Sequence, residues 1–150
     1  MRYGSGDFQY ELVEGWAKLP AGESFVDVGG ICIDAEDNVF VLNRSAYPII
    51  VMDRGGKVTA KWGQNHFDRA HGSCIAPDGT IYCTDDRTHL VSQFTTDGKL
   101  LTTLGEKYKP SDTGYREATD LFERIASITK GGGPFNRPTG VAVSASGQIF

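Results

Sequence analysis

Short apolar runs alternate with turn-forming residues along most of the chain. In its middle part the runs cover residues 72–76, 80–84, 90–95 and 100–104. The segments Pro77-Asp78-Gly79 and Thr96-Asp97-Gly98 separate them, and such residues accept the dihedral angles of tight turns. Runs of this length between turn signals predict four short strands.

The same pattern occurs more than once in the chain. Residues 30–33 align with residues 72–75 at a separation of 42 positions, and residues 39–41 align with 81–83 at the same separation. A third copy begins at Gly140, which is 68 positions after Gly72, so additional residues lie within 106–135. A period near 40 residues with four strands in each unit predicts the blades of a β-propeller.

The predicted fold is therefore all-β, with about two and a half blades. The first blade takes residues 28–69 and the second takes 70–105, while 136–150 begin a third blade that stops in its second strand. An N-terminal segment, 1–27, precedes the blades, and we interpret residues 10–13 as an isolated outer strand that closes a last blade. The missing blades then come from the rest of a longer chain, which we favour, or from other copies.

The insertion between the second and third blades, residues 106–135, has a different pattern. Leu121, Phe122, Ile125 and Ile128 follow helical spacing, and Asp120 can serve as the N-cap. We therefore expect a short helix within 120–130. The insertion either covers a pocket on one face of the propeller or is a surface loop without a role.

Composition narrows the possible partners and the compartment. The formal net charge of −4 and the lack of a Lys/Arg run argue against nucleic acid and anionic membranes as partners. We find no signal peptide and no apolar run of membrane-spanning length. Three cysteines, an odd number, in β-forming runs indicate a reduced, cytoplasmic protein, although export from a longer precursor remains an alternative.

One segment carries a resemblance to a known family. Residues 138–143, Pro-Thr-Gly-Val-Ala-Val, followed by Gly-Gln-Ile-Phe at 147–150, resemble the NHL repeat. Over residues 28–150 the order of features resembles peptidyl-α-hydroxyglycine α-amidating lyases. This resemblance implies a six-bladed propeller that cleaves a carbinolamide-type C–N bond in a small-molecule or peptide substrate. It also implies a catalytic zinc held by three histidines and a structural calcium.

The resemblance also implies roles for individual residues. His71 in Ala-His-Gly corresponds to a zinc ligand, and Arg44 corresponds to a catalytic arginine. The backbone carbonyls of Val28 and Ser73 correspond to calcium ligands. The chain departs from the family at Asn43, where the family has histidine, and at position 70, where alanine replaces proline. The other two zinc histidines have no counterpart within these 150 residues.

Each site residue also has a structural interpretation. His71 alone can be a hydrogen-bonded strand residue, and Arg44 can be a rim residue paired with Asp85 or Asp86. The segment 85–87 reads as a solvated turn, although Asp85, aligned with Asn43, can also face the channel as a further site candidate. We expect Trp62, aligned with a leucine of the second repeat, to be part of the core.

Three functions follow from these features. The first is a metal-dependent lyase resembling the amidating lyases. The second is a non-catalytic propeller that acts as a scaffold for binding proteins or ligands. The third, which we favour least, is a calcium-dependent lactonase, because that class uses acidic and amide ligands where this chain has His71.

Overall fold

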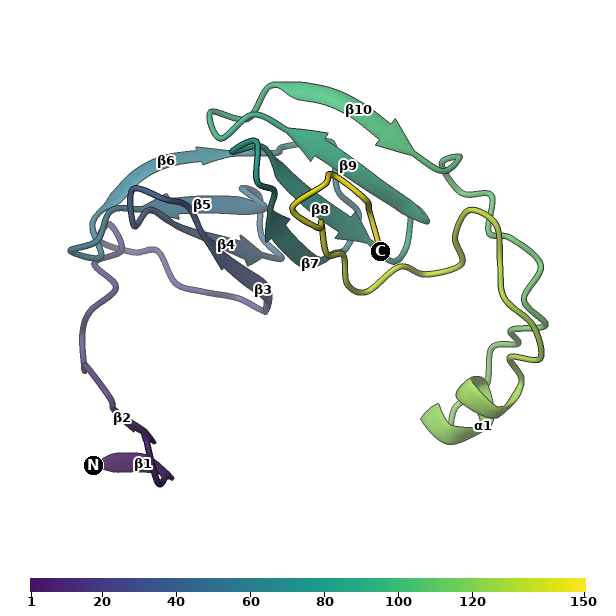
Figure 1. Cartoon of the computed structure of the whole chain (residues 1–150), viewed down its shortest axis with the longest axis horizontal. Helices are drawn as coiled ribbons and strands as arrows, with labels where there is room; N and C mark the ends of the chain where they lie inside the picture. Colours follow the sequence, from purple (N-terminus) through teal and green to yellow (C-terminus); the bar gives the residue numbers. More distant parts are fainter.

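Two four-stranded antiparallel sheets form the centre of the molecule. A computed structural model describes all 150 residues (Figure 1). Within each sheet the strands pair in chain order, and this meander confirms the predicted partial β-propeller. The first sheet comprises β3 (Val28–Ile33), β4 (Val39–Asn43), β5 (Ile49–Met52) and β6 (Val58–Trp62). The second comprises β7 (Ala70–Ile75), β8 (Ile81–Asp85), β9 (Leu90–Phe94) and β10 (Leu100–Leu104).

The main core lies between the two sheets. Nine buried side chains from both sheets form one cluster, in which the rings of Trp62 and Phe94 lie 5.2 Å apart. The expectation that Trp62 is a core residue is thus confirmed. The outer face of the first sheet is covered by Trp16, Leu19 and Phe25 of the N-terminal segment, which pack around a second buried cluster. Apolar side chains therefore cover both faces of the sheet at β4 and β5, whereas Ile31 and Ile33 of β3 remain exposed.

Glycines allow the innermost strands to approach one another. A Cβ atom on Gly30 would lie 2.8 Å from the carbonyl oxygen of His71, and one on Gly72 would lie 2.5 Å from that of Thr139. Gly140 has no neighbour within 4 Å of the equivalent point. Because these three glycines occupy one repeat position, successive blades meet through the same contact, as wedges around a shared axis.

The third repeat folds as a hairpin. The backbone groups of Ala142 and Phe150 exchange hydrogen bonds of 2.9 and 2.8 Å, and Val143 pairs with Ile149. Val143 and Phe135 pack against the outer face of the second sheet. The hairpin thus lies where the first two strands of a third blade belong.

The N-terminal segment differs from the sequence-based expectation. Residues 10–13 do not form an isolated strand, because β2 (Phe8–Glu11) pairs with β1 (Arg2–Ser5) in a hairpin. Residues 12 and 13 lie outside the strands. Every residue of both strands is exposed, and Figure 1 shows the hairpin apart from the two main sheets. Its role in closing a last blade stays a prediction.

The insertion contains the helix that its spacing predicts. Helix α1 covers Leu121–Ala126, and the Asp120 carboxylate accepts a 3.0 Å hydrogen bond from the Glu123 N–H, which confirms the predicted N-cap. The helix projects away from both sheets (Figure 1), so it does not cover a face of the second blade. No helix of this structure is both long and apolar enough to cross a bilayer.

Candidate functional site

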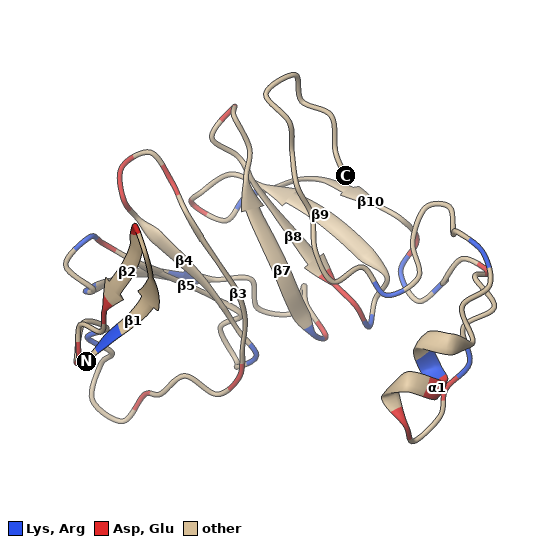
Figure 2. Ribbon diagram, turned by 60° about the horizontal axis from the view of Figure 1, so that its bottom comes forward, with Lys and Arg blue, Asp and Glu red and all other residues tan.

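Polar side chains gather at the end of the sheets where the innermost strands begin and the second strands finish. Figure 2 shows charged residues at the lower ends of β3, β7 and β8. Antiparallel pairing of β3 with β4 and of β7 with β8 brings these strand ends together. The residues that the sequence singles out, Arg44 and His71, lie at this end, which we call the rim.

Arg44 follows directly after β4 and spans the boundary between the two blades. Its Nε donates a 3.0 Å hydrogen bond to the carbonyl oxygen of Ala70, and its Nη1 is paired with the carboxylate of Asp27. Its backbone N–H donates to the carbonyl oxygen of Asp27 at 2.9 Å. The side chain is 22% exposed, so the guanidinium is held in a fixed position while it remains open to solvent. The alternative partners considered from the sequence, Asp85 and Asp86, are not its partners.

His71 is the second residue of β7 and is partly buried. Its carbonyl oxygen lies against Gly29 and Gly30 of the first blade, so the residue belongs to the innermost strand at the blade boundary. Ala70, whose carbonyl oxygen binds Arg44, immediately precedes it. The structure therefore brings the arginine and the histidine to the same blade boundary.

A small cavity opens beside Arg44. Its volume is about 140 Å³, and its walls include Phe67, Asp68 and Ala70 as well as Arg44. The hydroxyl of Tyr108 donates a 2.9 Å hydrogen bond to the Asp68 carboxylate, which ties the insertion to this wall. The cavity offers a cation and a carboxylate to a small polar group.

A buried acceptor ends the second strand of each blade. Asn43, 1% exposed, accepts a 2.8 Å hydrogen bond from the Val26 N–H, and Asp85, 3% exposed, accepts one of 2.6 Å from the Asp68 N–H. The acceptors are 42 positions apart, and so are the two donors, so the repeat reproduces this contact. The expectation of a solvated turn at 85–87 is wrong for Asp85 and Asp86, which are both buried, and holds for Arg87, which is exposed.

Asp85 accepts more hydrogen bonds than its counterpart in the first blade. Its two carboxylate oxygens accept from four backbone N–H groups, at 2.6 to 2.9 Å. Burial raises the pKa of this carboxyl, but the four N–H donors outweigh burial, so the pKa is lowered from its ordinary value. Asp85 thus holds the loops of its own blade, and a role facing the channel remains only a prediction.

An ion pair links the beginning of the innermost strand to the end of the second strand in both blades. In the first blade Arg44 pairs with Asp27, and in the second Asp86 pairs with Arg69 at 3.4 Å. Each residue lies 42 positions before its counterpart, so the pairs are equivalent and their charges are reversed. Asp27 and Arg69 were not predicted as site residues, although the repeat alignment of residues 30 and 72, extended back by three positions, pairs them.

The residues of this chain do not complete a metal site. No group of three or more His, Cys, Asp or Glu side chains lies close enough to hold a metal ion. The zinc role of His71 stays a prediction, and three-histidine coordination would require ligands beyond those gathered here. The calcium ligands predicted for the backbone carbonyls of Val28 and Ser73 stay predictions.

The environments of His66 and of the cysteines indicate structural rather than catalytic roles. The His66 ring lies edge-on to Phe67 and Phe94, and burial lowers its pKa. All three cysteines are free thiols, and burial raises the pKa of Cys32 to about 11. A thiol with so high a pKa is protonated and unreactive at neutral pH.

Comparison with known proteins supports the fold. No protein-family model and no curated protein matches the sequence. Virginiamycin B lyase from Staphylococcus aureus is similar in structure, with a TM-score of 0.53 and 16% identity over 81% of this chain and 33% of that chain. A catalytically inactive histidine-to-alanine variant of that enzyme with quinupristin has a TM-score of 0.51 and 16% identity, over 87% of this chain and 50% of that one.

A streptogramin B lyase structure is similar to the same degree. Its TM-score is 0.51 and its identity is 15%, over 81% of this chain and 46% of that chain. The chain thus spans half or less of the length of each of these three proteins. At such low identity the likeness shows a shared propeller-type fold and does not extend to the chemistry.

Proposed function

We propose that this chain forms part of a propeller lyase that cleaves a carbinolamide-type C–N bond, as the resemblance to the amidating lyases implies. The observation that carries the proposal is the fixed guanidinium of Arg44 at the boundary of two blades, where it binds the carbonyl oxygen of Ala70, the residue before His71. The solved structures of similar fold are named as lyases, and in one of them a histidine-to-alanine variant is described as catalytically inactive. An enzyme of similar fold is therefore known to lose its activity when one histidine is replaced.

Arg44 supplies the charge that such a reaction needs. Asp27 and the carbonyl oxygen of Ala70 engage only Nη1 and Nε, so N–H donors remain for a ligand. A guanidinium stays protonated at every physiological pH and binds carboxylates through two parallel hydrogen bonds. We assign Arg44 to the carboxylate end of the substrate or to a developing oxyanion.

The proposal also gives His71 a role at the rim. A neutral imidazole can accept a proton or bind zinc, and the zinc and calcium of the amidating lyases stay predictions for this protein. The substrate is a small molecule or a peptide with a hydroxylated carbon beside an amide nitrogen. Cleavage breaks the bond between that carbon and nitrogen: the nitrogen gains a proton, the hydroxyl oxygen loses one, and the carbon becomes a carbonyl.

Release of a carbonyl product tests the proposal. We would incubate the purified complete propeller, with all its blades, with a peptidyl-α-hydroxyglycine and measure glyoxylate, together with the zinc content of the protein. We expect His71→Ala to lose activity by about a hundredfold or more. His89→Asn is the matched control, because asparagine tolerates the positive φ of 62° found at that position. Equal activity and equal zinc content in both variants would remove the lyase assignment.

The binding scaffold is the second candidate. The observation that favours it is that Arg44 and its counterpart Asp86 both form ion pairs with the residue just before the first strand of their own sheet. If stability falls in the Arg44→Gln variant while turnover of the hydroxyglycine peptide is absent in all variants, the scaffold is the better description.

A further inference from the structure

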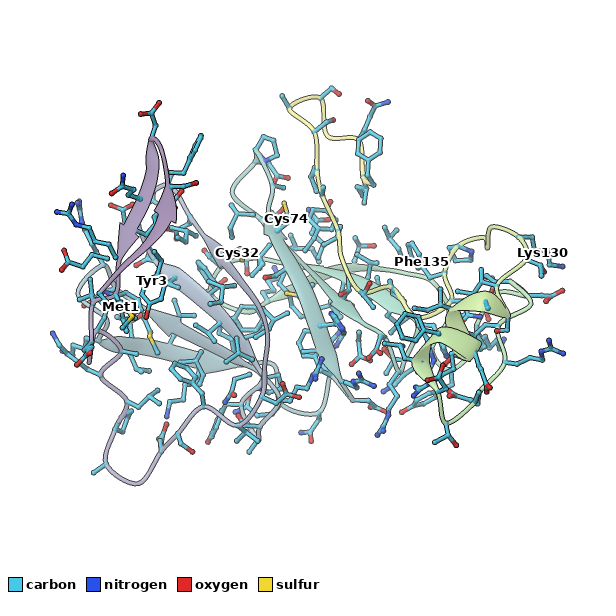
Figure 3. The ribbon with its side chains drawn as sticks, turned by 90° about the horizontal axis from the view of Figure 1, so that it is seen from below. Met1, Tyr3, Cys32, Cys74, Lys130 and Phe135 are labelled. Carbon is cyan, nitrogen blue, oxygen red and sulfur yellow. The ribbon has the colours of Figure 1, made fainter.

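The insertion and the beginning of the third blade line a large open cavity. Its volume is about 620 Å³, within the range of about 300–1,000 Å³ that is typical of small-molecule pockets. Leu121, Ile125 and Ile128 form one wall, and the segment 134–139 forms the other. Figure 3 shows Phe135 and Lys130, which both line the cavity, in the part of the molecule that contains α1.

Hydrogen bonds between the two arms of the insertion hold this cavity open. The Asn136 side chain donates to the carbonyl oxygen of Ser111 and to the Thr113 hydroxyl, both at 3.0 Å. The Thr129 N–H donates to the carbonyl oxygen of Thr113 at 2.9 Å. On the blade side, the Arg137 N–H donates a 3.0 Å hydrogen bond to Nδ1 of a histidine in the second blade, His89. The walls are therefore preformed, which lowers the entropic cost of binding a ligand.

The charge of the lining selects the ligand. Arg137 and Lys130 line the cavity, and no aspartate or glutamate does. Their acidic partners, Glu117 and Asp112, lie outside the lining. The guanidinium of Arg137 also lies 4.9 Å from the centre of the Tyr115 ring, which fixes its plane. Only Nη2 of this guanidinium is paired with Glu117, so further N–H donors are available.

The geometry points to a binding site for a small organic carboxylate with an apolar body. The apolar body contacts Leu121 and Ile125, whose side chains are otherwise exposed, and the carboxylate binds Arg137. A small molecule fits better than a protein segment because the cavity volume is that of a single compact ligand. This inference is independent of the proposed lyase reaction, because it concerns a cavity that contains neither Arg44 nor His71.

Calorimetric titration with a matched pair of probes tests the site. We would titrate 4-phenylbutanoate and its neutral amide, 4-phenylbutanamide, into the purified protein. Charge-assisted hydrogen bonds to Arg137 should make the carboxylate bind about tenfold more tightly than the amide. Equal affinity for both probes, or no binding of the carboxylate, would overturn the proposal.

Two variants on one helix locate the binding. Ile125→Asp places a charge in the cavity wall and should weaken carboxylate binding by about tenfold or more. Phe122→Asp is the matched control, because Phe122 is 77% exposed on the same helix and does not line the cavity. Circular dichroism verifies folding, and the residues concerned are exposed enough to tolerate both changes. If both variants bind the carboxylate with equal affinity, the proposal is overturned. It is also overturned if sedimentation shows that Ile125→Asp merely dissociates a dimer, because this wall of the cavity then binds a second copy of the chain.

Discussion

The two complete blades have the same framework at the rim but fill it with opposite charges. Arg44 and Asp27 in the first blade occupy the positions of Asp86 and Arg69 in the second. The fold therefore accepts either sign at each position, provided that the two charges are opposite. Folding alone does not require a cation at position 44, so the guanidinium that faces the small cavity is available for a function.

The two blades differ more strongly at the residues that precede Arg44 and Asp86, namely Asn43 and Asp85. Asn43 accepts one backbone hydrogen bond and donates one to the Ser45 hydroxyl, whereas Asp85 accepts four from backbone N–H groups. A buried carboxylate needs this many donors because its charge is otherwise costly to remove from water. The second blade therefore depends on a single side chain to a greater degree than the first.

Replacement of the buried acceptors Asp85 and Asn43 should have the largest effects on the free energy of unfolding. Asp85→Ala leaves four backbone donors without their partner, and we expect a loss of about 4 kcal/mol in the free energy of unfolding. Asn43→Ala removes one backbone contact and one side-chain contact, so we expect about 2 kcal/mol. Urea unfolding followed by tryptophan fluorescence measures both, and equal losses would show that the carboxylate has no special role.

The close approach at the glycines of the innermost strands also differs from one repeat to the next. Gly72→Ala would bring a methyl group within 2.5 Å of the carbonyl oxygen of Thr139, so the third repeat must shift. We expect a loss of about 2–3 kcal/mol, as for other substitutions that overfill a packed site. The same substitution at Gly140 meets no atom within 4 Å and is the matched control. Comparable losses at both positions would contradict the account of how blades meet.

Much of this framework was predictable because the repeat specifies it. The register that aligns residues 30–33 with 72–75 places eight strands correctly, and Asp120 marks the start of α1. The burial of Asp85 and Asp86 was not predictable from local sequence, since two acidic residues beside an arginine are ordinarily solvated. Asp85 is buried against the backbone donors of residues 68–69, and Asp86 against the side chain of Arg69, and only the folded chain brings these groups near.

The N-terminal hairpin shows a second limit. Residues 10–13 have the alternation of an outer strand, but the pairing of Tyr10 with Tyr3 depends on a two-residue turn at 6–7, in which Gly6 has a positive φ. The strand signal was therefore real at residues 10 and 11, whose partner in this structure is β1, and the pairing with a last blade stays a prediction. Arg44 and His71 were singled out only through the family resemblance, and their roles stay predictions. The cavity beside Arg44 is not evident from the neighbours of Arg44 in sequence.

Acid should destabilise the second blade through Asp85. Its pKa in the folded chain is lowered, so the carboxylate contributes stability above its unfolded pKa of about 3.9. That contribution is lost as the pH falls through the folded value. Asp85→Asn removes the titrating group, so its free energy of unfolding should depend less on pH below pH 4. Parallel urea titrations of the two proteins between pH 7 and pH 3 measure this. Identical pH profiles would show that the carboxylate is not held as described.

Exchange of charges in the first blade should have the smallest effect on stability and the most informative effect on function. The Asp27→Arg/Arg44→Asp double variant reproduces the polarity of the second blade, and we expect its free energy of unfolding to remain within about 1 kcal/mol of the original protein. Each single variant places like charges together and should be less stable than the double variant. Because the double variant keeps the ion pair but removes the guanidinium from its position beside Ala70, turnover of a hydroxyglycine peptide should be lost. Retained turnover would assign Arg44 to blade structure alone, whereas lost turnover in a fully stable protein would separate its chemical role from its part in the fold.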